Sequence, residues 1–317
     1  MKKTFISVFT IFIGVALITS TAFPWGSATH AYIDDQIGKR LGPKNKNEIY
    51  GGMAPDIFNY AFDLPQPLYD YLRAETHGVY GDTTDDKYFM KVWNEAGWGF
   101  QENLGFGFVS HNDMWGADST AHWRARTNPI EGYVITKAVI LEVALSDAWI
   151  LLGIDHPDYY PLRVELCHNL IETAGDIIIR RIDRRVGQKV MTSALTRHHS
   201  FPDLLVSAYA EGLINLPGMS YPKAVGLITT AEKEFRKMMI LYGNALVRSE
   251  DKAIQLLAEQ LAELAEIFVG IPVSSELAEE ALRAAISVLE MYGDYYAEIS
   301  ATIDNVVLEL ESHGVSY

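Results

Sequence analysis

Cysteine is almost absent from this chain of 317 residues, in which Cys167 is the single example. One thiol cannot form an internal disulfide, so the stability of the fold must come from packing or from bound metal. The sequence also lacks low-complexity tracts, long linkers, repeats at a fixed period, a Gly-rich phosphate-binding loop and a serine with an evident catalytic partner. The chemistry must therefore lie with other residue types.

Basic residues are in deficit. The chain has 26 Lys and Arg against 41 Asp and Glu, which gives a formal net charge of −15. Such a balance is unfavourable for binding phosphate backbones and for tight attachment to anionic membranes. We therefore expect no stable nucleic-acid binding. Because 49% of the residues are hydrophobic and 21% are charged, the composition is that of a folded protein rather than a disordered one.

Long apolar runs are scarce, and the one uncharged example, residues 5–18, lies at the N-terminus. Lys2 and Lys3 precede it, and small or polar residues follow it at 19–22, as in a secretory signal. The run is shorter than the roughly 20 residues of a membrane span. We predict a signal peptide over residues 1–22, cleaved after residue 22 or 24, and a secreted or periplasmic location. An uncleaved interfacial anchor is the alternative.

Alternating strand patterns are also scarce, and helical periodicity takes their place. Apolar residues recur at spacings of three and four over one stretch, at Ile254, Leu257, Leu261, Leu264 and Phe268. Pro272 and Ser274 then stop and restart the pattern, and residues 277 to about 310 again look helical. We predict an all-α protein with short helices and structured loops up to about Asn128. A metal-bearing domain would span 25–215, with a C-terminal helical extension over 216–317 packed on it.

His168 and Glu172 are four residues apart, which places them on one helix face with Cβ atoms roughly 5–6 Å apart. An imidazole and a carboxylate in this arrangement can bind one zinc ion. Because this spacing is common in helices, a solvated His–Glu pair is the alternative.

His111, Asp118 and His122 are separated by seven and four residues, so an uninterrupted helix would carry them on one face. His111 would then lie two turns, about 10 Å, from Asp118, and could share a metal with it only if the helix is distorted, for which Gly116 is a plausible place. The apolar surroundings indicate a buried segment, and buried His and Asp need partners or a metal. A polar stripe on an exposed helix is the alternative.

Four further residues complete an ordered series. Trp25 and His30 follow the signal, Asp56 stands in Ala54-Pro55-Asp56, and His77 stands in Thr76-His77. Taken singly, Asp56 is typical of a helix cap or turn and His77 of a loop. In this order, with the helices that follow, the series resembles the zinc-dependent phospholipase C family, whose wider relatives include the S1/P1 nucleases. The resemblance covers roughly half of the chain, from Trp25 to Glu172.

The resemblance implies a multi-helix bundle with three zinc sites. The first would use Trp25 (through its amine and carbonyl), His30 and Asp118; the second Asp56, His77, His111 and the bridging Asp118; the third His122, His168 and Glu172. Nitrogen and oxygen ligands without thiolate suit catalytic zinc. The implied activity is hydrolysis of a phospholipid phosphodiester during peripheral membrane contact, with Asp56 and Glu172 as catalytic residues.

Two departures from the family pattern leave alternatives open. Six residues separate His111 from Asp118 where the family usually has three, so Asp113 is the substitute for Asp118. Pro24 also bears on the first site, because cleavage after residue 22 would leave two residues ahead of the Trp25 amine. The alternative functions are an S1/P1-type nuclease and a non-catalytic exported protein with a metal-binding helical fold.

Overall fold

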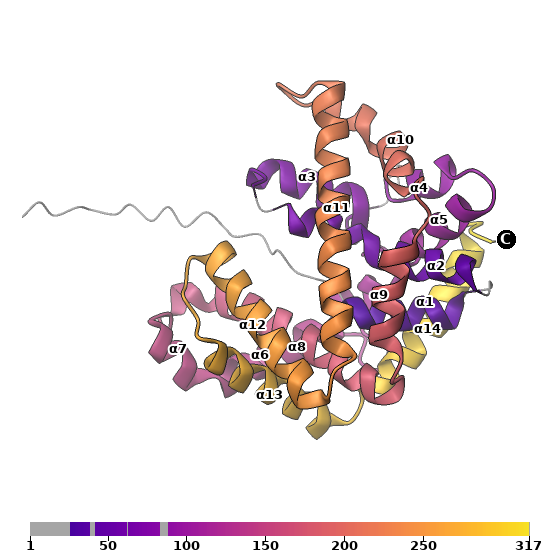
Figure 1. Cartoon of the computed structure of the whole chain (residues 1–317). Coiled ribbons are helices and arrows are strands. Elements are labelled where there is room, and N and C mark those ends of the chain that lie inside the picture. The colour runs from indigo at the N-terminus through magenta and orange to yellow at the C-terminus, as the bar shows by residue number, and fades with distance from the viewer. Residues whose placement is uncertain (1–25, 39–41, 62, 83–87, 317) are drawn as a thin grey trace, which may run out of the picture.

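Within the described residues, 26–38, 42–61, 63–82 and 88–316, the chain is helical and contains no strand (Figure 1). The structure, a computed structural model, thus confirms the all-α class. The predicted signal peptide and Trp25 lie outside these residues. Across the same ranges, none of the helices has the length and apolar character that crossing a bilayer requires.

Short helices and structured loops form the first part of the chain, as the composition predicts. They are α1 (Ser27–Ile37), α2 (Pro43–Met53), the 3-10 helix η1 (Ala54–Tyr60), α3 (Gln66–His77), α4 (Met90–Glu95), α5 (Phe100–His111) and the π-helical turn η2 (Ser119–Trp123). Proline stands in the first turn of three of them, at Pro43, Pro55 and Pro67. The fixed φ of proline favours a helix start, where its missing N–H costs nothing.

Longer helices follow and are joined by tight connections. They are α6 (Tyr133–Ala144), α7 (Ser146–Leu152), the 3-10 turn η3 (Pro157–Tyr159), α8 (Tyr160–Ile182), α9 (Val186–Thr196), α10 (Phe201–Ile214), α11 (Tyr221–Leu246), α12 (Glu250–Val269), α13 (Ser275–Tyr292) and α14 (Tyr295–Ser312). The predicted restart is confirmed, because the Ser274 side chain accepts a hydrogen bond from the Leu277 N–H. The helical character expected from 277 to about 310 is confirmed, and it is divided between α13 and α14. Gly293, with φ of 63°, ends α13 in a left-handed conformation that glycine adopts at low cost.

Helix α8 lies at the centre of the packing and contacts α1, α6, α12 and α13, while α11 packs on α9, α10 and η1 (Figure 1). The main cluster of buried apolar residues extends from Ala28 in α1 to Val315 after α14. The C-terminal helices therefore share a hydrophobic core with the first half of the chain. The boundary between residues 215 and 216 stays a prediction.

Helices α2 and α5 cross at unusually short range because glycines stand at the crossing. A Cβ on Gly107 would lie 2.0 Å from the Glu48 carbonyl oxygen, and a Cβ on Gly51 would lie 2.2 Å from the Leu104 carbonyl oxygen. Both distances are far below van der Waals contact, so only glycine allows this approach. The crossing matters for function because α5 ends at His111.

Replacing Gly107 with alanine should therefore destabilise the fold, by roughly 1–3 kcal/mol as expected for overpacking. Gly226 in α11 is the matched control, because a Cβ there meets nothing within 4 Å. Gly226→Ala should raise stability by up to about 1 kcal/mol, since alanine is the better helix former. Urea unfolding of both variants measures the difference. Equal effects of the two substitutions would contradict the close crossing.

Candidate metal centre

The first buried cluster joins α8 to the π-helical turn. His168 and Glu172 lie one turn apart on α8, with Nε2 of His168 2.6 Å from Oε1 of Glu172. His122 comes from η2, and its Nε2 lies 3.8 Å from the same oxygen. The three side chains are buried, and their ligand atoms lie close enough to one another to hold a metal ion. We call them the α8 triad.

The second cluster is centred on Asp118, which has an imidazole on each side. Its Oδ1 lies 3.1 Å from Nε2 of His30, and its Oδ2 lies 2.9 Å from Nε2 of His111. Nε2 of His77 lies 3.9 Å from Oδ2 of Asp118 and 3.3 Å from Oδ1 of Asp56. Two candidate metal groups result, one of His30, His111 and Asp118 and one of Asp56, His77 and His111.

Those two groups share His111, and this limits how they can be filled. The Nδ1 atom of His111 is bonded to the Gly52 carbonyl oxygen at 2.7 Å, so it carries the ring proton and leaves Nε2 as the free donor atom. One nitrogen lone pair can bind only one ion. If His111 binds an ion together with Asp56 and His77, an ion beside His30 has only His30 and Oδ1 of Asp118 as ligands and needs others.

The chain reaches Asp118 through a break and not along one helix. Helix α5 ends at His111, and the side-chain oxygen of Asn112 then accepts hydrogen bonds from the N–H groups of residues 114, 115 and 116 at 2.9, 2.9 and 3.2 Å. Gly116 completes the turn, because a Cβ there would lie 2.6 Å from the carbonyl carbon of His111. An uninterrupted helix face through His111, Asp118 and His122 is therefore absent, and the distortion that the sequence predicts near Gly116 is present. The tight turn instead brings Asp118 back against His111.

Asp113 lies beside the ligands and orients one of them. Its Oδ1 accepts a hydrogen bond from Nδ1 of His122 at 2.7 Å, and its Oδ2 accepts one from Arg73 at 3.0 Å. Burial alone would favour the neutral carboxyl, but Arg73 and His122 hold the pKa of Asp113 at about 2. Asp113, Asp118 and His122 also lie close enough to form a metal group. Since both Asp113 oxygens are already bonded, the contacts favour Asp118 as the ligand and Asp113 as its neighbour.

Many buried polar atoms of the two clusters approach one another at ion-pair distance but make no hydrogen bond of good geometry among the described residues. They are Nδ1 and Nε2 of His30, Nε2 of His111, both oxygens of Asp118, Nε2 of His122, Nε2 of His168 and both oxygens of Glu172. Leaving buried polar atoms without partners costs on the order of 1–3 kcal/mol each, more for charged groups. Bound cations would satisfy these atoms, and a set of nitrogen and oxygen donors without thiolate fits zinc.

The charge states of the ligands differ with their surroundings. Burial lowers the pKa of His30 to about 4 and raises the pKa of Asp56 well above its usual range. Burial also raises the pKa of Asp118, but the neighbouring His111 and His30 outweigh this effect and hold that pKa well below the usual range. A neutral His30 beside an ionised Asp118 has the protonation that a metal ion requires of its ligands.

Asp176 was missed by sequence reasoning, although it fixes the start of α1 against α8. Its two oxygens accept hydrogen bonds from the N–H groups of Ala28 and Thr29, both at 2.7 Å, and from the hydroxyls of Thr29 and Tyr242. Gly26 allows the approach, because a Cβ there would lie 2.5 Å from the Asp176 carboxyl carbon. The only signal in the sequence is that Asp176 follows Glu172 by four residues.

The structure thus brings together every predicted ligand that it describes: His30, Asp56, His77, His111, Asp118, His122, His168 and Glu172. Trp25 lies outside the described residues. Arg73, whose guanidinium reaches Asp113 from α3, is a further site residue that no sequence pattern indicated. Cys167 beside His168 is a buried core residue. Comparison of the chain with protein-family models, with curated proteins and with solved structures gives no match.

Asp113→Asn should weaken metal binding at the α8 triad by roughly 10–100-fold, the usual effect of removing a carboxylate that orients a ligating histidine. Competition with a chromophoric chelator measures the affinity. Asp158→Asn is the control, because the Asp158 side chain is 80% exposed on η3. Wild-type metal affinity in Asp113→Asn would show that Asp113 does not orient His122.

Proposed function

We propose that this protein is a zinc-dependent phosphodiesterase of the phospholipase C type, with a helical bundle of the kind shared with S1/P1 nucleases. The observation that carries the proposal is the convergence of buried imidazoles and carboxylates from α1, η1, α3, α5, η2 and α8 on adjoining metal groups. Buried unpartnered atoms of this kind are costly in a fold that does not use them. The ordered resemblance along the sequence supports the same conclusion.

The charge of the ligand set favours an anionic substrate. The candidate ligands include three carboxylates, Asp56, Asp118 and Glu172, and the remaining described ligands are imidazoles. Three divalent ions would leave this set with a net positive charge in a buried site. A phosphodiester offers the compensating negative charge and has oxygens that suit such a site.

The roles of the chain's own residues follow from their contacts. When bound, zinc would lower the pKa of water toward neutrality and offset charge on the phosphoryl oxygens. Asp56 is held by the Asn59 side chain, which donates to its Oδ1 at 2.8 Å, and Asn59 is held in turn by the Tyr69 hydroxyl. Because burial raises its pKa, the Asp56 carboxylate is suited to take a proton from the attacking water. Glu172 would serve as a ligand and hold the α8 triad together.

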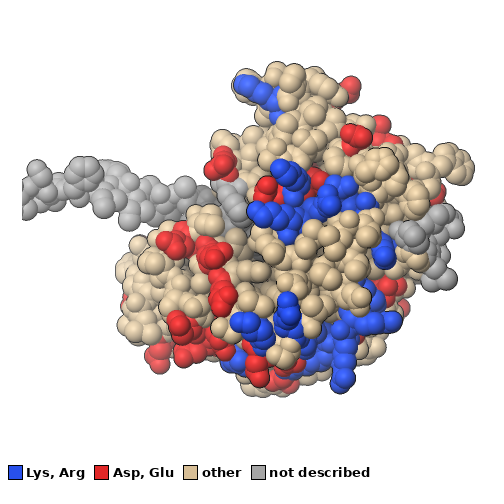
Figure 2. Space-filling model, in the orientation of Figure 1, with Lys and Arg blue, Asp and Glu red and all other residues tan. Residues whose placement is uncertain are grey.

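The surface around the site favours a lipid over a nucleic acid. In Figure 2, acidic side chains gather over α12 and basic ones over α9 and α11. Helix α12 lines the small cavity that contains Glu172, and Glu263 and Glu266 are exposed on it. An excess of carboxylates, 41 Asp and Glu against 26 Lys and Arg in the whole chain, repels a polyanion, whereas a phospholipid brings only one or a few charges.

Replacing His168 or Glu172 with alanine should lower zinc content by about one ion per chain and reduce activity by at least about 100-fold. His156→Ala is the control, because its side chain is 67% exposed and remote from the clusters. Zinc is measured by elemental analysis and activity by release of phosphocholine from phosphatidylcholine. Full activity in either triad variant would refute the scheme.

Substrate class is tested on the same preparation. Wild-type protein should release phosphocholine and leave single-stranded DNA intact. The opposite outcome would assign the site to the nuclease alternative. Three bound zinc ions without either activity would assign it to the non-catalytic alternative.

The N-terminal residue should decide how many zinc ions bind. Since His111 can serve one ion, the His30 side lacks ligands that the Trp25 amine and carbonyl would supply. Protein beginning at Trp25 should bind about three zinc ions, and protein that keeps Phe23 and Pro24 should bind about two. Mass spectrometry identifies the terminus and elemental analysis counts the zinc. The same zinc content in both forms would remove Trp25 from the site.

A further inference from the structure

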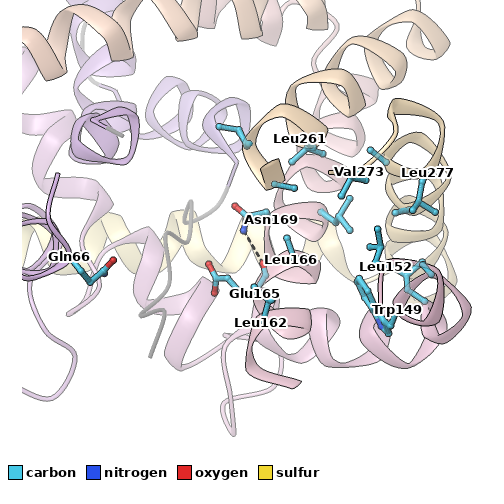
Figure 3. Close-up of a pocket in the computed structure, with 17 residues that line it drawn as sticks. Gln66, Trp149, Leu152, Leu162, Glu165, Leu166, Asn169, Leu261, Val273 and Leu277 are labelled. Atoms are coloured by element: carbon cyan, nitrogen blue, oxygen red, sulfur yellow. Dashed lines mark hydrogen bonds between the residues drawn. The ribbon is translucent and has the colours of Figure 1, made fainter. Parts of the chain in front are cut away.

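An apolar pocket with a volume of about 200 Å³ lies between α7, α8, α12 and α13 (Figure 3). Apolar side chains from all four helices line it, among them Trp149, Leu166, Leu261 and Leu277. An apolar cavity of about 150 Å³ is already large enough to take up benzene and to exclude water. The pocket therefore has the size and lining to hold a hydrocarbon group.

The two ends of the pocket differ in polarity. Gln66, Glu165 and Asn169 lie toward one end, and Leu152, Leu277, Val273 and Trp149 lie toward the other (Figure 3). The polar end adjoins the α8 triad, because Oε2 of Glu165 lies 3.8 Å from Nδ1 of His168. An elongated molecule with one polar end would enter with that end toward the metal ligands.

A second, smaller cavity of about 50 Å³ lies beside the pocket and borders the candidate metal centre. Glu172 lines this cavity, together with Gly26 and Thr173. It shares Asn169, Leu261 and Leu264 with the larger pocket. One face of α8 thus leads from the hydrocarbon lining past Asn169 to a metal ligand.

The far end of the pocket reaches an exposed apolar surface. In α7, Trp149 and Leu152 line the pocket, and the residues between them, Ile150 and Leu151, are 62% and 78% exposed. Large apolar side chains at the tip of a short helix are suited to enter the edge of a lipid layer. Helix α7 therefore carries both the apolar end of the pocket lining and the exposed apolar side chains.

We propose that the pocket between α7, α8, α12 and α13 binds one acyl chain of a phospholipid whose phosphate lies at the candidate metal centre. The proposal rests on the proposed function for the position of the phosphate. The acyl chain is the chosen occupant because the pocket combines hydrocarbon lining, a polar end at metal ligands and an exposed apolar tip. Each buried methylene should strengthen binding by about fourfold.

Filling the pocket tests this assignment. Ala265→Trp in α12 and Ala148→Trp in α7 place an indole in the lining from two different helices. The ratio of kcat/KM for dioctanoyl- to dibutyryl-phosphatidylcholine should fall by at least about tenfold, mainly through KM for the longer substrate. Ala144→Trp, at an exposed position of α6 outside the lining, is the matched control. An unchanged ratio in both lining variants that keep the wild-type melting temperature would overturn the proposal.

A binding measurement separates this proposal from the proposed function. The wild-type protein should bind the fluorescent fatty acid cis-parinaric acid, and both lining variants should bind it at least about tenfold more weakly than Ala144→Trp does. If the wild-type protein binds the probe but has no phosphodiesterase activity, and both lining variants lose probe binding, the pocket assignment stands and the proposed function is refuted. Phosphodiesterase activity with probe binding that neither lining variant weakens would keep the proposed function and refute the pocket.

Discussion

The cost of removing imidazoles and carboxylates from water is the constraint on which this structure depends. Besides Asp113, eight side chains that could ligate metal are packed inside an all-helical protein, and several of their polar atoms make no hydrogen bond among the described residues. A fold tolerates such a group only if something restores the lost solvation. The surrounding contacts hold these atoms in position, and a bound cation would restore the solvation that they have lost.

The contacts that position the candidate ligands come from neighbouring residues. Asp113 and Arg73 fix the outer nitrogen of His122, and the Gly52 carbonyl fixes that of His111. Asp176 holds the beginning of α1, and with it His30, against α8 through two backbone N–H groups. Each contact sets the direction of a ligand without occupying its inward-facing atom. This division between inner and outer atoms is typical of metal sites in which outer partners orient the ligating histidines.

Sequence reasoning reached the helical class and the residues of the candidate metal groups, but it did not reach the path of the chain between them. Helical periodicity and the scarcity of alternation sufficed for the class. Types and spacings sufficed for His168 and Glu172, because four residues make one turn. Between His111 and Asp118 the sequence indicated a distortion at Gly116, but not the turn that the Asn112 side chain builds there, because periodicity does not register a side chain bonded to the backbone. Asp176 escaped notice because its partners in α1 are 147 and 148 residues away, and no local pattern encodes so distant a contact.

The π-helical turn that carries His122 has a consequence for how the sequence can change. A π-turn arises when one extra residue is accommodated within an α-helical path, and each residue of an α-helix advances the chain by about 100° around its axis. Deleting Thr120 or Ala121 would remove the extra residue ahead of His122 and turn its ring away from His168 and Glu172. Substitutions on the outer side of this turn leave that angle untouched. Chain length in this segment is therefore under stricter constraint than the identity of the residues beside His122.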